Sequence, residues 1–141
     1  MAVSLGHRVV PSFLARDMRR TLEFYTEKLG FQQTAYYPIA SDPEWTEVRR
    51  DDVTLRFYTE PPHGTRTSPV CSGTIYFYPD SVEALAVEWR GRVRFEWGPE
   101  VMDYGMREFG IRDPNGYLLA FAEPAKPIEA APPQSSSDGA E

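Results

Sequence analysis

The feature that most constrains this chain of 141 residues is one order of elements that occurs twice. Each half begins with a strand-like stretch, continues with an amphipathic helix and ends with three further strand-like stretches. Met18 and Val82 open the two helical stripes, and 64 positions separate them, as they separate Phe13 from Phe77. A repeat of this kind predicts two copies of one βαβββ module that share a core.

The apolar periodicity and the turn residues predict the bounds of these elements. The first half is predicted to contain a helix between Asp17 and Gly30, and strands at residues 9–15, 31–37, 45–50 and 53–59. The second half is predicted to contain a helix that opens at a capping pair, Asp80 and Glu83, and strands at residues 73–78, 93–97, 106–112 and 117–123. Residues 97–105 are expected to form a loop. The fold class is therefore α+β, with mixed sheets.

These elements divide the chain into four segments. Residues 1–61 form the first module, 62–72 a linker, and 73–123 the second module. Residues 124–141 are rich in Pro, Ala and Ser and contain almost no bulky apolar side chain. Such a segment cannot bury enough surface to offset its ordering entropy, so we expect a disordered tail.

Composition narrows the class of partner. The net charge of -6 argues against nucleic acid, because phosphate binding needs a basic surface. The apolar runs are far too short to cross a membrane, and the chain start lacks the features of a signal peptide. The single cysteine, Cys71, excludes an internal disulfide and fits a reducing compartment. We therefore predict a cytoplasmic protein without a nucleic-acid or membrane partner.

Two motifs indicate a family. The helix carries the pattern D-x-x-x-x-L-x-F-Y-x-x-x-L-G-F from Asp17 onward, and the last turn reads D-P-N-G-Y at residues 113–117. Both resemble the vicinal oxygen chelate superfamily of glyoxalases, extradiol dioxygenases and bleomycin-resistance proteins. The run G-M-R-E-F at residues 105–109 most resembles the bleomycin-resistance branch. The resemblance implies βαβββ modules with sheets curled around a cavity that a homodimer completes.

The resemblance also indicates where a metal would bind. In metal-dependent members the ligands lie on the first and last strands of each module, and the corresponding positions here are Val10, Arg56, Thr74 and Ala120. Valine and alanine have no donor atom, threonine has a weak one, and the arginine charge repels a cation. His7 and His63 lie elsewhere in the sequence and do not replace these ligands. We expect no metal and no other cofactor.

Strand alternation predicts which side chains line the cavity. If Ala120 faces the cavity, Leu119 and Phe121 pack under the helices. The same parity turns Arg56 and Glu108 inward. The predicted ligand-binding residues are Arg56, Tyr58, Tyr76, Tyr78, Trp97, Met102, Tyr104, Met106, Glu108, Leu118 and Ala120. No catalytic residue is predicted.

The two inward charges have two possible roles, and so does Trp97 in the predicted loop. Arg56 and Glu108 either pair across the cavity floor, since a lone buried charge is costly, or meet a charged group of the ligand. Trp97 either closes over a planar ligand together with Met102 and Tyr104, or belongs to the core or to a dimer interface.

These features favour a metal-free protein that binds small molecules and resembles the bleomycin-resistance proteins. Its expected ligand is an aromatic, cationic compound, such as a drug of the bleomycin type, held in the cleft of a homodimer. One alternative is a glyoxalase- or dioxygenase-like enzyme with a displaced metal site or metal-free chemistry, so enzyme activity stays an open question. Another is an interaction module with a vestigial cavity.

Overall fold

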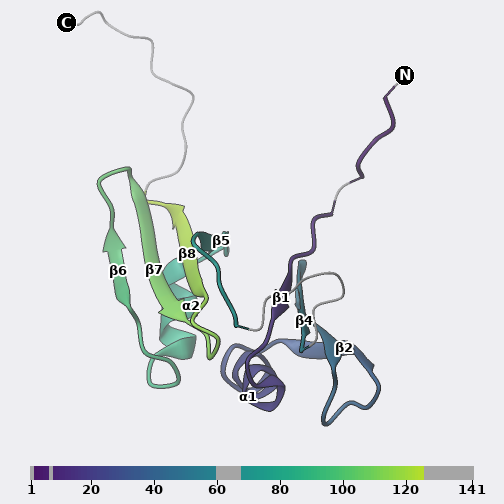
Figure 1. The fold of residues 1–141 in the computed structure, drawn as a ribbon. Coiled ribbons are helices and arrows are strands. Elements are labelled where there is room, and N and C mark those ends of the chain that lie inside the picture. The colour runs from purple at the N-terminus through teal and green to yellow at the C-terminus, as the bar shows by residue number, and fades with distance from the viewer. Residues whose placement is uncertain (1, 7, 60–67, 126–141) are drawn as a thin grey trace, which may run out of the picture.

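The computed structural model describes residues 2–6, 8–59 and 68–125, which form two four-stranded sheets (Figure 1). The first sheet has the order β1-β4-β3-β2 and contains β1 (Ser12–Leu14), β2 (Gln32–Tyr37), β3 (Trp45–Arg50) and β4 (Val53–Tyr58). The second has the order β5-β8-β7-β6 and contains β5 (Thr74–Phe77), β6 (Trp97–Val101), β7 (Met106–Arg112) and β8 (Leu118–Pro124). The two sheets have the same connectivity, which confirms the predicted α+β fold of two βαβββ modules.

The residue pairing shows how closely the modules repeat. In the first sheet β1 runs parallel to β4 and Ser12 lies opposite Arg56. In the second sheet β5 runs parallel to β8 and Tyr76 lies opposite Ala120. Both residues of the second pair lie 64 positions after their counterparts, as the sequence predicts. Most of the predicted linker and tail lies outside the described residues.

A helix follows the first strand of each module. Helix α1 (Met18–Glu23) begins at Asp17, whose carboxylate accepts a hydrogen bond from the backbone N–H of Arg20, and it continues as the π-helical segment η1 (Phe24–Lys28). Helix α2 (Val82–Trp89) begins at Ser81, whose hydroxyl accepts from the N–H of Ala84 at 3.0 Å. The predicted cap at Asp80 is therefore wrong by one position. No helix among the described residues is long and apolar enough to cross a membrane.

The helix-facing sides of both sheets pack into one shared core. Phe57 and Phe121, at equivalent positions of β4 and β8, belong to the same cluster of buried residues. The ring of Tyr25 lies 4.9 Å from that of Phe57, and the ring of Trp89 lies 4.9 Å from that of Phe121. The opposite face of each sheet, here called its open face, turns away from this core.

Each hairpin also contacts the helix of the other module, and we call these contacts the two clasps. In the buried clasp, the Tyr25 hydroxyl donates to Asp113 Oδ2 at 2.9 Å, and Asn115 Oδ1 accepts from the N–H of Arg16 at 2.7 Å. In the exposed clasp, both guanidinium nitrogens Nη1 and Nη2 of Arg50 donate to the Glu88 carboxylate on α2. The clasps cross-link the modules in both directions.

One predicted element is wrong. Residues 93–97 were expected to form the sixth strand and 97–105 a loop, but β6 occupies Trp97–Val101. Gly98 and Pro99 indicated a loop because neither suits a regular strand. An irregularity in the pairing between Trp97 and Glu100 accommodates them, and Gly98 adopts a φ of 74° there. Pro99 lies on the edge strand of the sheet, so no neighbouring strand needs a hydrogen bond from the N–H that proline lacks.

Candidate functional site

The open face of the second sheet brings together three of the predicted site residues around the carboxylate of a fourth, Glu108. Glu108 is only 1% exposed although it carries a charged side chain. Its Oε2 accepts from Trp97 Nε1 at 3.0 Å and from the Tyr76 hydroxyl at 3.4 Å, and its Oε1 accepts a short bond from the Tyr104 hydroxyl. Three aromatic donors from three different segments thus hold one buried carboxylate.

The donors of this cluster are neutral, and this determines its electrostatics. None of the ion pairs among the described residues includes Glu108. Hydrogen bonds lower the cost of burying the carboxylate, but they leave its negative charge without a positive partner. The hydrogen bond to Glu108 is also the main reason that the pKa of Tyr104 lies far above its usual value.

Strand β6 positions Trp97 within this cluster. Trp97 lies opposite Gly110 of β7, and its indole ring covers the place where a side chain at Gly110 would be. A Cβ atom at Gly110 would lie 2.2 Å from the nearest indole carbon. Gly110 thus lets the indole lie flat on the sheet, where its N–H reaches Glu108.

The remaining predicted residues of the second module lie around this cluster. Ala120 is fully buried beside Gly110 and Tyr76, and Leu118 is half-buried on the same face. Tyr78 stacks on Tyr76 with ring centroids 6.3 Å apart and is largely exposed. Met106 begins β7 and Met102 lies in the β6–β7 turn, and both are half-buried. The open face is therefore aromatic around a flat floor of small residues.

Arg56 and Tyr58 lie on the open face of the first sheet and form a separate group. Arg56 Nε donates to Glu47 Oε2 at 2.9 Å, and its guanidinium carbon lies 5.8 Å from the centre of the Trp45 ring. The hydrogen bond from Arg56, aided by one from Thr34, lowers the pKa of Glu47. The suggested pairing of Arg56 with Glu108 is wrong within one chain, since Arg56 is paired with Glu47.

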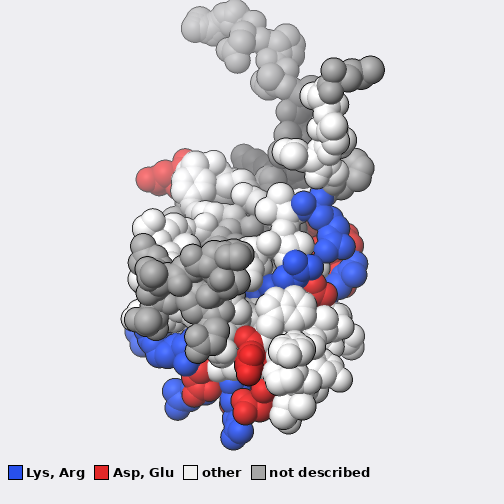
Figure 2. All heavy atoms as spheres, turned by 45° about the vertical axis from the view of Figure 1, so that its right-hand side comes forward, with Lys and Arg blue, Asp and Glu red and all other residues white. Residues whose placement is uncertain are grey.

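One side of the molecule carries mixed charge, because Figure 2 shows basic and acidic side chains lying next to one another there. On the first sheet's open face, the Arg56–Glu47 pair neutralises its own two charges locally. The two open faces therefore differ: one carries a compensated ion pair, and the other carries an uncompensated carboxylate.

Three residues of the first open face are not among the predicted ligand-binding residues. They are Tyr37, Trp45 and Glu47. Tyr37 pairs with Trp45, Trp45 pairs with Tyr58, and Glu47 pairs with Arg56. The tight turn at Asp51 and Asp52 could have located Glu47, because equal steps along both strands from that turn bring Glu47 opposite Arg56. Glu108 and Trp97 were predicted, but their hydrogen bond was not.

The side chains at the family's metal positions do not fit a metal ion. Ala120 offers only a methyl group, Arg56 presents a cation, and Val10 precedes β1. Thr74 provides a single exposed hydroxyl. Over residues 2–6, 8–59 and 68–125, no three His, Cys, Asp or Glu side chains cluster in a way that could hold an ion. His7 and His63 lie outside the described residues.

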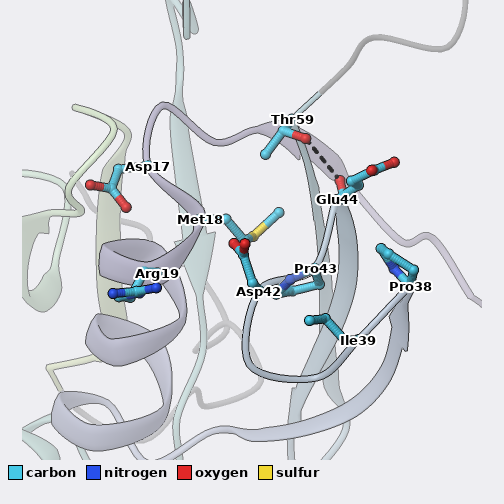
Figure 3. A pocket seen from close by; sticks show the side chains of 9 residues that line it. All are labelled: Asp17, Met18, Arg19, Pro38, Ile39, Asp42, Pro43, Glu44 and Thr59. Atoms are coloured by element: carbon cyan, nitrogen blue, oxygen red, sulfur yellow. Dashed lines mark hydrogen bonds between the residues drawn. The ribbon is translucent and has the colours of Figure 1, made fainter.

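A hollow in the first module contains none of the predicted residues. Its volume is about 560 Å³. Figure 3 shows the lining side chains: Met18 and Arg19 at the start of α1, Ile39, Asp42 and Pro43 in the β2–β3 loop, and Thr59 after β4. Asp17 also lines it, but one of its carboxylate oxygens already caps α1. We assign no function to this hollow.

The sequence of this chain matches one protein family over nearly all of its described residues. Residues 5–121 match the model of the Glyoxalase/Bleomycin resistance protein/Dioxygenase superfamily. The chain belongs to this superfamily. The match confirms the resemblance to the vicinal oxygen chelate proteins that the helix and turn motifs indicated. A comparison with curated proteins finds no match.

Several solved structures are similar to this chain. TnmS3, an antibiotic binding protein from Streptomyces sp. CB03234, has 24% sequence identity and a TM-score of 0.68, over 87% of this chain and 99% of that one. TioX from Micromonospora sp. ML1 has 14% identity and a TM-score of 0.71, over 83% and 98%. The bleomycin-binding protein of bleomycin-producing Streptomyces verticillus, solved with copper(II)-bleomycin, has 25% identity and a TM-score of 0.59, over 86% and 97%.

Proposed function

We propose that this protein binds and sequesters an aromatic, cationic small molecule, without a metal ion, in a cleft between two copies of the chain. The observation that carries the proposal is the buried Glu108 carboxylate, which has three aromatic donors and no cationic partner within residues 2–6, 8–59 and 68–125. A ligand cation beside Glu108 would supply the missing charge, and Tyr76, Trp97 and Tyr104 would stack on its ring system.

The superfamily neighbours support the same class of ligand. One is described as an antibiotic binding protein and another as a bleomycin-binding protein. The first open face supports the need for a second chain: its aromatic group of Tyr37, Trp45 and Tyr58 turns away from the shared core, as Glu108 does. A second copy could cover Glu108 with such a face.

Calorimetric titration tests the proposal with matched compounds. The panel contains bleomycin, a planar aromatic cation of small size, and a neutral aromatic compound of the same shape. We expect saturable binding of the cations. Glu108→Gln should weaken that binding roughly 10- to 100-fold, because hydrogen bonds to charged groups contribute more than neutral ones.

Glu27→Gln is the control, since Glu27 is an exposed carboxylate on η1 and remote from the open faces. It should leave every affinity unchanged. Binding of the neutral compound should change little in either variant. Equal binding of the cations to the wild type and to Glu108→Gln would refute the assigned role of Glu108, and no binding across the panel would refute the function.

A further inference from the structure

A second cavity lies on the helix side of the second module, away from both open faces. Its volume is about 500 Å³. The end of β5, the first turns of α2 and the β3–β4 hairpin line it, through Phe77, Tyr78, Leu85, Trp89 and Val53 among others. Glu108 does not line this cavity, so it is separate from the proposed cleft.

The internal repeat shows what occupies the equivalent place in the other module. There the β7–β8 hairpin packs against β1 and α1, and Tyr117 is only 3% exposed. The Tyr117 ring lies 4.9 Å from the ring of Phe13, and its hydroxyl donates to the Leu14 carbonyl at 2.7 Å. A phenol side chain therefore fills the space between that hairpin and that strand.

The residues around the two spaces correspond position by position. Phe13 and Leu14 correspond to Phe77 and Tyr78, because Phe13 pairs with Phe57 as Phe77 pairs with Phe121. Tyr25 corresponds to Trp89, since each packs 4.9 Å from the paired phenylalanine of the last strand. The cavity beside α2 thus has equivalents of both groups that Tyr117 contacts. The Phe77 ring corresponds to the ring of Phe13, and the Tyr78 carbonyl corresponds to that of Leu14.

The residue that would fill the cavity is the one that differs. Val53 occupies the position of Tyr117, because Tyr117 lies 64 residues after Val53, the same separation as between the other equivalent residues; Val53 begins β4 and Tyr117 directly precedes β8. Valine lacks the ring and the hydroxyl. The hairpin is also shorter: four residues lie between the paired Arg49 and Thr54, against five between Arg112 and Leu118.

The exposure of equivalent residues agrees with an unfilled space. Thr21 on α1 is fully buried, whereas its counterpart Leu85 on α2 is only half-buried.

We propose that the cavity between α2, β5 and the β3–β4 hairpin is a binding site for a small phenol. The phenol ring packs on Phe77 and Leu85, and its hydroxyl donates to the Tyr78 carbonyl, as the Tyr117 ring and hydroxyl do in the other module. The site recognises the compound by a flat ring and a single hydrogen-bond donor, and it needs neither Glu108 nor a second chain.

Titration of the ¹⁵N-labelled protein with 4-methylphenol tests this site by NMR. We expect saturable shifts of the amide signals at the end of β5 and along α2, centred on Tyr78, Ala84 and Leu85. 4-Methylanisole has nearly the same shape but no donor. It should bind roughly five- to tenfold more weakly, because the carbonyl is then left without a partner.

Two variants block the cavity from different sides. Val53→Tyr inserts the missing side chain from the hairpin, and Ala84→Phe fills the cavity from α2. Either should abolish the saturable shifts, so the test does not depend on one variant folding well. Glu108→Gln should leave 4-methylphenol binding unchanged, which separates this site from the proposed cleft.

Three outcomes would overturn the proposal. The first is the absence of saturable shifts, and the second is shifts centred on Tyr76, Tyr104 and Glu108. The third is unchanged binding in folded Val53→Tyr and Ala84→Phe proteins.

Discussion

Gly110 determines where the Trp97 indole lies, because any side chain at this position would occupy the place of the ring. Gly110→Ala should therefore displace the indole and break its hydrogen bond to Glu108. We expect a loss of about 1–3 kcal/mol in the free energy of unfolding, as for other overpacked sites. Thermal unfolding measures the loss, and tryptophan emission should shift as the ring becomes exposed.

Gly73→Ala is the matched control for this substitution. A Cβ atom at Gly73 would meet nothing within 4 Å, so this variant should unfold like the wild type. If Gly110→Ala behaved in the same way, the indole would not be fixed by the absence of a side chain at Gly110.

Asp113 gives a pH-dependent prediction at the same scale. Burial raises the pKa of the Asp113 carboxyl above its ordinary value of 3.8, although hydrogen bonds from Tyr117 N–H, the Tyr25 hydroxyl and Asn115 act in the opposite direction. The folded state therefore binds the proton more tightly than the unfolded state does. This contribution to stability is complete below pH 3.8 and is lost as the pH rises through the folded-state pKa.

Asp113→Asn removes this titration and isolates it from the other carboxyl groups. As the pH falls from neutral towards 3.8, the stability of the wild type should rise relative to that of the variant. Denaturant unfolding at several pH values measures the difference. A relative loss of wild-type stability over that window would contradict the raised pKa.

At the scale of elements, the two clasps should differ in strength. In the buried clasp, Asn115 accepts from the N–H of Arg16 and contacts the Thr21 hydroxyl, and both Asn115 and Thr21 are buried. In the exposed clasp, the Glu88 side chain is 41% exposed, and solvent screens its pair with Arg50. Asn115→Ala should cost about 1–3 kcal/mol because it leaves buried groups unpaired, whereas Glu88→Ala should cost less than about 1 kcal/mol.

Urea unfolding of the two variants gives this comparison directly. Raising the salt concentration should reduce the effect of Glu88→Ala and leave that of Asn115→Ala unchanged, since only the former involves a screened charge pair. Equal costs for both variants would mean that burial does not distinguish the clasps.

The sequence predicted most elements because their patterns were regular. The bounds of β3 and β7 agree with the predicted ranges 45–50 and 106–112. The prediction of β6 was wrong because glycine and proline indicate a loop locally. The pairing of Trp97 with Gly110 across the sheet makes this segment a strand. Local sequence patterns do not contain such a long-range contact.

The candidate site was predictable to a similar extent. Period-two alternation separated Leu119 and Phe121 of the core from Ala120 on the open face. It did not reveal that Arg56 pairs with Glu47, because alternation assigns a face and not a partner. Nor did it reveal that Glu108 collects three neutral donors, which depends on the bend of β6 and on the β6–β7 turn that carries Tyr104.

At the scale of the whole molecule, both open faces expose aromatic side chains, and the proposed cleft requires a second chain to cover them. Sedimentation equilibrium should therefore give a mass of twice 16.1 kDa. Trp45→Ala should weaken the dimer at least about tenfold, because a tryptophan at an interface often contributes more than 2 kcal/mol. A single-chain mass at every concentration would contradict the dimer.

Val87→Ala is the control for the dimer experiment. Val87 is 65% exposed on α2, outside both open faces. Its removal should leave the mass unchanged.

The reciprocal clasps also make this chain suitable for dissection. Each module carries a hairpin that fits the helix of the other, so a chain cut between β4 and β5 would yield two fragments with complementary ends. Each fragment alone would lack the contacts of both clasps, and reassembly would restore both clasps at once. The protein could thus serve as a split reporter, in which fusion partners attached to the two fragments control whether the fold forms.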